Sequence, residues 1–135
     1  EIYTLSLHDA LPISVEQLCR KSVLRQQLSD ALSKVYDIER LMTRIMYKTA
    51  TPRDVKSLSL TALQLPEIKK ILGEFSSKLL TELNSKIDTL EDISGLVERA
   101  IVDEPPITAK EGGVIKDGFN AELDNLRHII SGCSI

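Results

Sequence analysis

The chain has 135 residues, of which 42% are hydrophobic and 27% charged, so it is long enough for one folded domain and too apolar for a disordered one. Its net charge is only −3, and no apolar run approaches the ~20 residues needed to cross a bilayer. Aromatic residues make up 4% and tryptophan is absent, a composition that favours helices packed through aliphatic side chains. Cys19 and Cys133 form no Cys-x-x-Cys motif, and reduced thiols are expected.

The first thirteen residues, EIYTLSLHDALPI, raise a separate question of origin. They carry no Lys or Arg and no clean helical or strand period, so they do not read as a signal peptide or as one regular element. They resemble, codon by codon, the translation of a common sequencing-library adapter. We therefore predict that residues 1–14 are a non-native segment and that the natural domain occupies residues 15–135. Glu1 and Asp9 lie in this segment, so the remainder is close to neutral.

Short helices account for the next part of the chain. Residues 15–19 read as the end of a helix, and a helical stripe then begins after Ser22 with Leu24, Leu28, Ala31, Leu32 and Val35. Asp37 is placed to cap a further helix, because an aspartate at that position accepts from free N–H groups. The apolar face of that helix contains Ile38, Leu41, Met42, Ile45 and Met46.

The strongest start signal is Thr51-Pro52-Arg53-Asp54, with a capping threonine, a proline at the first helical position and an acid in the first turn. Val55, Leu58, Ala62 and Leu63 continue that helix. Pro66 removes a backbone donor, so we predict a restart there. The stripe of the restarted helix consists of Ile68, Ile71, Leu72, Phe75, Leu79 and Leu83. Thr89, followed by Glu91 and Asp92, repeats the capping chemistry before a stripe of Ile93, Leu96, Val97, Ala100 and Ile101.

The sequence EPPITAKEGGVIKDGF cannot form a continuous helix, because it contains two prolines and three glycines. Residues 107–110 and 114–116 could pair as a small hairpin around Gly112-Gly113, for which a turn with positive φ is a better explanation than a phosphate loop. Helical spacing resumes at Phe119 and runs to the end. Both ends of the pattern fall within helices, which favours a piece of a larger protein. The predicted fold class is therefore all-α, a helical bundle with at most one small hairpin near 107–116.

The residues for catalysis are missing from the sequence. It contains no Gly-x-x-x-x-Gly-Lys-Ser/Thr loop and no Gly-x-Ser-x-Gly elbow, and His128 is the only histidine outside the first segment. Metal binding requires several ligands at suitable spacing, which this chain lacks. No catalytic, nucleotide-binding, DNA-binding or metal-binding residue can be assigned.

Charge is unevenly distributed along the chain. Residues 20–56 hold an excess of Lys and Arg, whereas residues 87–104 are strongly acidic. A basic segment can contact nucleic acid, but here the bases are scattered and no aromatic residues are interleaved for stacking. Solvated helix faces and internal ion pairs are the simpler interpretation.

The order of three motifs, VYDIERLMTRI, TATPRDVKSL and LPEIKKIL, resembles the core region of the MutS DNA mismatch-repair family. The later run LVERAIVDEPPITAKEGGVIKDGFNAELDNLR is similar to the continuation of that region, so the resemblance covers about residues 15–127. The tail HIISGCSI departs from it. The residues that carry the pattern are Asp37, Glu39, Arg40, Arg44, Pro52, Arg53, Asp54, Glu98, Pro105, Pro106, Gly112, Gly113, Gly118, Glu122 and Leu123.

The resemblance implies that the full-length protein forms homodimers or heterodimers around duplex DNA. Such a protein senses mispairs and small loops, and it couples this to ATP binding and hydrolysis with Mg²⁺. The mismatch-reading, clamp and ATPase parts are absent here: Phe75 and Phe119 lack a Phe-x-Glu context. This part of the family protein would be a scaffold and lever without a cofactor of its own, which leaves open whether the chain should be described as part of an enzyme. The expected location is the cytoplasm of a bacterium, at the nucleoid, with no membrane partner.

A second hypothesis is a stand-alone helical interaction module that shares only the bundle pattern. A complete module should begin and end with helix caps, whereas this pattern starts and stops within helices. A phosphate-loop motif encoded downstream would decide between the two hypotheses.

Overall fold

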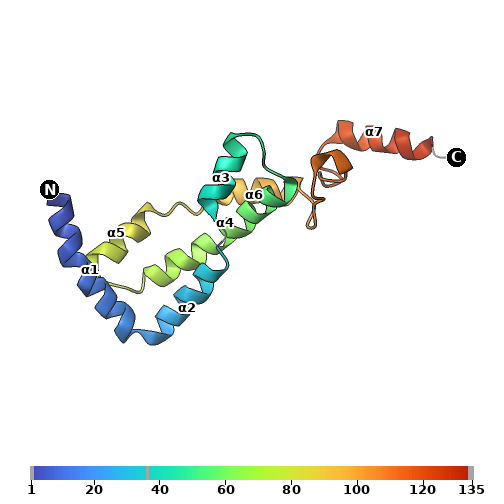
Figure 1. Ribbon diagram of the computed structural model, residues 1–135. Coiled ribbons are helices and arrows are strands. Elements are labelled where there is room, and N and C mark those ends of the chain that lie inside the picture. The colour runs from blue at the N-terminus through green and yellow to red at the C-terminus, as the bar shows by residue number, and fades with distance from the viewer. Residues whose placement is uncertain (1, 36, 134–135) are drawn as a thin grey trace.

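The computed structural model describes residues 2–35 and 37–133, with side chains described from Leu11 onward. The chain is an elongated assembly of helices in which α1 and α7 lie at opposite ends (Figure 1). The backbone of residues 2–13 lies in the continuous helix α1, so the expectation that these residues do not form one regular element is wrong. Their origin as a translated adapter stays a prediction. The side chains of residues 1–10 and all of residues 134–135 lie outside the described part. No strand occurs among the described residues, which confirms the all-α fold class.

One end of the molecule is built by α1 (Ile2–Arg20), α2 (Ser22–Ser33) and α5 (Lys78–Lys86). Together with the end of α4 they enclose an apolar core of Leu28, Ala31, Ile68, Ile71, Leu72, Phe75 and Leu80. Gln17 on α1 accepts from the backbone N–H groups of Ser76 and Ser77, at 3.1 and 2.9 Å. Ser14 is buried, and its hydroxyl lies 2.8 Å from that of Ser77. The residues just before α5 are therefore held by side chains of α1.

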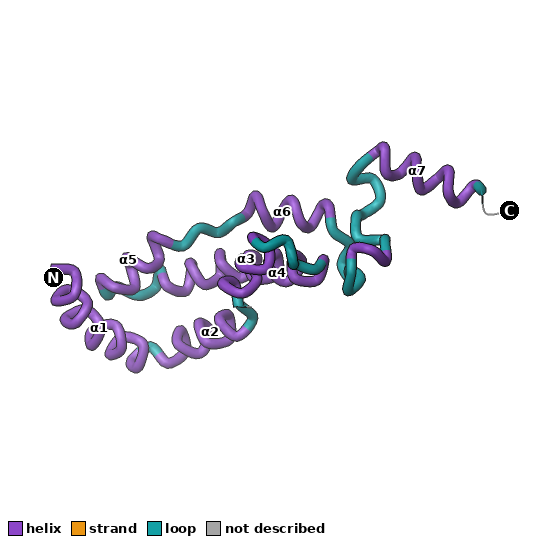
Figure 2. Tube along the Cα trace, turned by 45° about the horizontal axis from the view of Figure 1, so that its top comes forward, coloured by secondary structure: helices purple, strands orange, loops and turns teal. Residues whose placement is uncertain are grey.

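The central element is α4 (Pro52–Leu72), which packs against α2, α3, α5 and α6 (Figures 1 and 2). The expected restart at Pro66 is wrong, since α4 continues through this residue. A proline inside a helix costs ~3 kcal/mol. Ala62 before it and Ile68, Ile71 and Leu72 after it are all buried, so packing along both halves offsets that loss.

The stripe expected to run from Ile68 to Leu83 is instead divided between two helices. α4 ends before Gly73, and α5 begins after Ser77, whose hydroxyl accepts from the N–H of Leu80 at 3.2 Å. Phe75 lies between the helices and is 4% exposed, because the connecting segment folds back onto the core. In the sequence, Phe75 continues the helical spacing of Ile71 and Leu72, so the break between α4 and α5 was not predicted.

Two helices flank the first half of α4. α3 (Ile38–Met46) begins where expected, and the carboxylate of Asp37 accepts from the N–H of Arg40 at 3.1 Å. α6 (Glu91–Ala100) differs, because its N-cap is Leu90 in the left-handed region (φ 51°) with no side-chain cap. The prediction that Thr89 caps this helix is therefore wrong. Asp88 instead accepts from the N–H of Leu90 at 3.0 Å and stabilises the turn before α6.

The predicted hairpin partner of residues 114–116 is also wrong. Residues 109–111 form a short 3₁₀ helix, η1 (Ala109–Glu111), and Ile115 makes an antiparallel bridge with Ile101. The N–H of Lys116 donates to the carbonyl of Ala100 at 2.8 Å, and that of Val102 donates to the carbonyl of Val114 at 3.0 Å. Residues 114–116, the strand-like segment, thus pair with residues 100–102 at the end of α6.

α7 (Ala121–Gly132) starts two residues later than expected and projects from the rest of the molecule (Figures 1 and 2). Its N-cap is Asn120, which accepts from the N–H of Leu123 at 3.0 Å. Within the described residues α7 makes no extended contact with another helix. None of the helices among the described residues has the length and apolar character needed to cross a membrane.

Candidate functional site

The first half of α4 carries a set of charged side chains that join α3, α6 and the segment after α6. We call this set the polar junction and define it by Arg44, Arg53, Asp54, Lys56, Glu98, Asp103 and Lys116. Four of these residues, Arg44, Arg53, Asp54 and Glu98, carry the family pattern in the sequence. The structure therefore brings together residues that are up to 72 positions apart in the chain.

Asp54 ties the end of α3 to the start of α4. Its carboxylate accepts from the backbone N–H of Thr51 at 2.8 Å, while the Thr51 hydroxyl accepts from the N–H of Asp54 at 3.2 Å. This reciprocal pair is a capping box. The same carboxylate lies 3.1 Å from the guanidinium of Arg44 on α3. One side chain therefore starts α4 and fixes the neighbouring helix to it.

Arg53 makes the next contact, across 52 positions of sequence. Its Nε donates to the carbonyl of Pro105 at 3.1 Å. Pro105 is buried and cannot donate a backbone hydrogen bond, so its carbonyl is the only main-chain polar group it offers. The contact holds the segment after α6 against the first turn of α4.

Lys56 is the buried centre of the junction, with its side chain 10% exposed. Its ammonium donates to Glu98 on α6 at 2.9 Å and lies 3.5 Å from Asp103 in the following segment. Lys116 lies 3.3 Å from the same Asp103 carboxylate and donates to the carbonyl of Glu98 at 2.8 Å. Two lysines and two acids thus link α4, the end of α6 and the strand-like segment.

The three junction groups with shifted pKa values all favour their charged forms. Hydrogen bonding to Glu98 raises the pKa of Lys56 despite the opposing effect of burial. The backbone hydrogen bond from Thr51 is the main cause that lowers the pKa of Asp54, with Arg44 adding to it. Lys116 is the main cause that lowers the pKa of Asp103. The junction is therefore a charged network at neutral pH.

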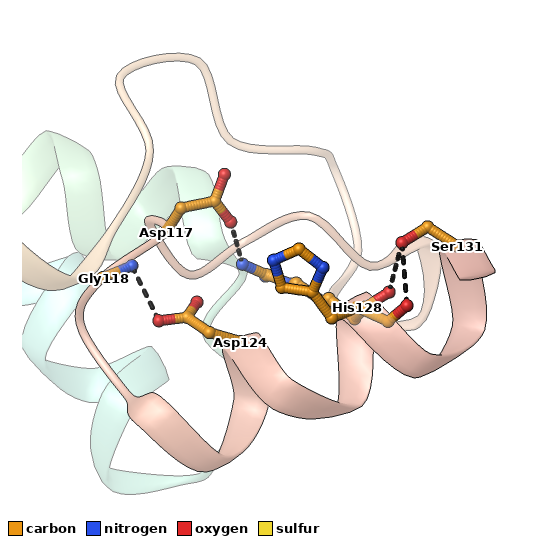
Figure 3. A pocket seen from close by; sticks show the side chains of 6 residues that line it. Asp117, Gly118, Asp124, His128 and Ser131 are labelled. Carbon is orange, nitrogen blue, oxygen red and sulfur yellow. Dashed lines mark hydrogen bonds and ion pairs between the residues drawn. The ribbon is translucent and has the colours of Figure 1, made fainter.

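The contacts continue to the base of α7. Arg127 donates to the carbonyl of Ile115 at 2.9 Å and to the carboxylate of Asp117 at 2.6 Å. The N–H of Gly118 donates to Asp124 at 3.0 Å, so α7 is attached to the preceding turn on two sides (Figure 3). A hollow of about 410 Å³ adjoins these groups.

Other family-pattern residues lie outside the junction and have structural roles. Asp37 caps α3, and the carbonyl of Glu39 accepts from the hydroxyl of Thr43 at 2.8 Å. Gly112 and Gly113 have φ of 75° and 70°, as expected for a turn, and Gly118 has φ 83°. Arg40 lies near Asp54 and contributes to lowering its pKa. Pro52 is buried at the first position of α4.

Sequence reasoning missed the roles of Lys56, Asp103, Lys116 and Arg127. The only signal for the first two was the contrast between the basic segment 20–56 and the acidic segment 87–104. Lys56 lies in the first segment, and Glu98 and Asp103 lie in the second. The simpler interpretation, internal ion pairs, therefore describes these contacts correctly.

The chemistry of the junction is that of a structural joint. Each lysine and arginine that composes it is engaged by an acid or a carbonyl, so none of them is poised to attack a substrate or transfer a proton. No group of three or more His, Cys, Asp or Glu with metal-binding geometry occurs among the described residues. What the arrangement can do is keep α3, α4, α6 and the segment around Lys116 in fixed register.

Comparison with known proteins agrees with this arrangement. The family described as MutS domain III matches residues 13–132. Three curated proteins, each called DNA mismatch repair protein MutS, are similar to the chain. The one from Alkaliphilus oremlandii is 47% identical over 113 residues, 84% of this chain and 13% of that protein. Those from Halothermothrix orenii and Acetivibrio thermocellus are 42% and 38% identical, over 84% and 91% of this chain.

The chain spans only 13–14% of the length of these relatives. The family match nevertheless covers residues 13–132, which include the second part of α1 and all of α2 to α7. It therefore includes every residue of the polar junction. On this evidence the chain belongs to the MutS domain III family.

Proposed function

We propose that this chain is the helical core segment of a DNA mismatch-repair protein. In that protein it would transmit displacement between the parts that contact DNA and the parts that hydrolyse ATP. The observation that supports this proposal is the set of charged contacts that join α3 to α4, α4 to α6 and α6 to the segment around Lys116. In that segment the carbonyl of Ile115 in turn accepts a hydrogen bond from Arg127 of α7.

The geometry suits a mechanical role, because transmission between distant sites requires elements that move as units. α4 has 21 residues and so is about 31 Å long at 1.5 Å per residue. The apolar core lies along its second half and the polar junction along its first half. A displacement imposed on either end is therefore carried by one continuous helix.

The cofactor and partners of this function belong to the whole protein. ATP with Mg²⁺ would be bound by another part, since the sequence of this chain has no phosphate loop. Mismatched duplex DNA and a second family subunit are the proposed partners. The bacterial sources of the relatives support action in the cytoplasm at the nucleoid.

An exchange experiment tests this function directly. Residues 14–133 would replace the matching segment of the Alkaliphilus oremlandii relative, which is 47% identical over 113 residues. The hybrid would then be expressed in a bacterial strain that lacks its own MutS. We expect the mutation rate to fall towards that given by the unaltered relative. A hybrid that is expressed, folded and of the same oligomeric state as the relative but leaves the mutation rate unchanged would refute the proposal.

A second arm tests the junction. The hybrid with Lys56→Met is expected to repair less well, because the side chain that joins α4 to α6 and Asp103 is removed. The matched control is Lys86→Met, which removes an exposed lysine paired with Glu82 on its own helix. Equal repair by the two variants would contradict the role of the junction.

A further inference from the structure

The polar contacts that attach α7 to the preceding segment come from Asp124 in its first turn and from Arg127 in its middle. We define the clasp as Arg127 with its two acceptors, the Asp117 carboxylate and the Ile115 carbonyl, together with the bond from the Gly118 N–H to Asp124. Ile115 is itself bridged to Ile101, and Lys116 belongs to the polar junction, where it donates to the carbonyl of Glu98. Ile115 and Lys116 are thus held against the end of α6, and α7 follows them in the chain.

A hinge lies between these two parts. Gly118 has φ 83°, and the turn around it is closed by the N–H of Phe119, which donates to the carbonyl of Lys116 at 3.3 Å. A Cβ atom added at Gly118 would meet nothing within 4 Å, so a substitution there would be opposed by the positive φ and not by crowding. Glycine populates positive and negative φ about equally, so Gly118 can change conformation at little cost.

The clasp is weak enough to open. The Asp117 side chain is 90% exposed and that of Arg127 is 32% exposed, and the adjoining hollow admits water beside them (Figure 3). Exposed ion pairs contribute little and are screened by salt. In the described structure α7 makes no extended contact with another helix, and its Leu123 and Leu126 line an open hollow together with Ile115 and Phe119 of the preceding segment.

We propose that the clasp is a conformational latch: closed, it sets the angle of α7 through Arg127, and opened, it lets α7 swing about Gly118. This inference deepens the proposed function, on which its biological meaning rests, because it identifies where the lever is coupled to the body. Arg127 acts as a positioning residue. An open population on the order of 0.1–10% is expected in the unaltered chain, the usual range for a minor state.

The test measures the angle of α7 by spin labels on the whole chain. Cys133 lies exposed after α7 and serves as one labelling site. The other is Asp92→Cys on the exposed start of α6, with Cys19→Ser to remove the remaining thiol. Double electron–electron resonance then gives the distribution of distances between α6 and α7. The unaltered clasp should give one dominant, narrow distance.

Arg127→Met should raise the ratio of open to closed molecules about 5- to 30-fold, as expected for the loss of one weak ion pair and one hydrogen bond. Gly118→Ala should act in the same direction, because alanine disfavours φ near +83°. Sodium chloride at ~1 M should broaden the distribution of the unaltered chain. The matched control is Arg99→Met, since Arg99 donates to the carbonyl of Gly95 within its own helix, α6.

Identical distributions for the unaltered chain and Arg127→Met would overturn the proposal. Equal broadening by Arg99→Met would overturn it as well. Circular dichroism of each variant checks that helix content is retained, and Gly118→Ala provides a second variant should Arg127→Met fail to fold. The readout does not depend on DNA repair. An inactive hybrid in the exchange experiment would therefore refute the proposed function and leave the clasp standing.

Discussion

Replacing Asp54 with alanine is the most informative single change to the polar junction. Asp54 accepts from the N–H of Thr51 at 2.8 Å and lies 3.1 Å from Arg44. Asp54 is the N3 acid of the capping box, and loss of the hydrogen bond that it accepts from Thr51 costs ~1 kcal/mol. The ion pair adds up to ~1 kcal/mol, because the Arg44 side chain is 36% exposed and counts on the surface scale. We expect the free energy of unfolding to fall by about 2 kcal/mol.

The loss is measured by urea unfolding, followed by circular dichroism. The slope of the unfolding free energy against urea concentration should be the same for the variant and the unaltered chain. Asp54→Asn separates the two contributions, because its amide oxygen can still accept from Thr51 while its charge is lost. Asp92→Ala is the matched control: Asp92 is also an acid in the first turn of a helix, but it is exposed on α6. Its loss should cost under ~1 kcal/mol through the helix dipole alone.

The pKa of Asp54 also predicts how this loss of stability depends on pH. Its folded value lies below the ordinary 3.8, so its charge stabilises the fold fully above that value. The contribution is lost as pH falls through the folded pKa. The stability difference between the unaltered chain and Asp54→Asn should therefore shrink as the pH is lowered from ~5 to below ~3. A loss below ~0.5 kcal/mol for Asp54→Ala, or a difference from Asp54→Asn that ignores pH, would refute this reasoning.

Three further predictions follow from the sequence and the contacts. Deleting residues 1–13 while keeping Ser14, which bonds to Ser77, should leave the melting temperature nearly unchanged. If the free energy of unfolding fell by more than ~2 kcal/mol, the scale of one buried apolar side chain, these residues would belong to the core. Gly112→Val should destabilise by ~1–3 kcal/mol in urea unfolding through strain at φ 75°, whereas Gly95→Ala on α6 should not, and equal effects would contradict the backbone argument. The purified chain should not hydrolyse ATP in a phosphate-release assay, and it should bind mismatched duplex no more tightly than matched duplex. A saturable NMR shift at residues 110–118 on addition of nucleotide would contradict this and show that the glycine turn is a binding site.

Local chemistry explains the parts of the fold that sequence reasoning predicted well. Asp37 and Thr51 were recognised as caps because the residues they satisfy lie within three positions. Gly112 and Gly113 were recognised as a turn because few other residues tolerate positive φ. The same reasoning failed at Leu90, whose left-handed φ is stabilised by a bond to Asp88 and carries no residue-type signal.

Long-range packing accounts for the errors. The helix through Pro66 is held by buried neighbours on both sides, which a local rule for proline cannot include. The bridge partner of Ile115 is Ile101, on the far side of two prolines, so a hairpin over the nearer residues was the natural prediction. The Lys56–Glu98 contact spans 42 positions, and only the contrast in charge between two segments indicated it. Gln17 reaches the start of α5 across 59 positions without any such signal.

Coupling through the polar junction is the central claim, and the ATPase of the hybrid protein measures it most directly. The quantity is the ratio of ATP hydrolysis rates with mismatched and with matched duplex, compared between the hybrid and its Lys116→Met variant. Lys116 joins Asp103 and the carbonyl of Glu98 to the segment that leads into α7. We expect the ratio to move towards one in this variant while the rate without DNA is retained. Lys86→Met, on the far end of the molecule, should leave the ratio unchanged. An unchanged ratio in Lys116→Met would contradict the account.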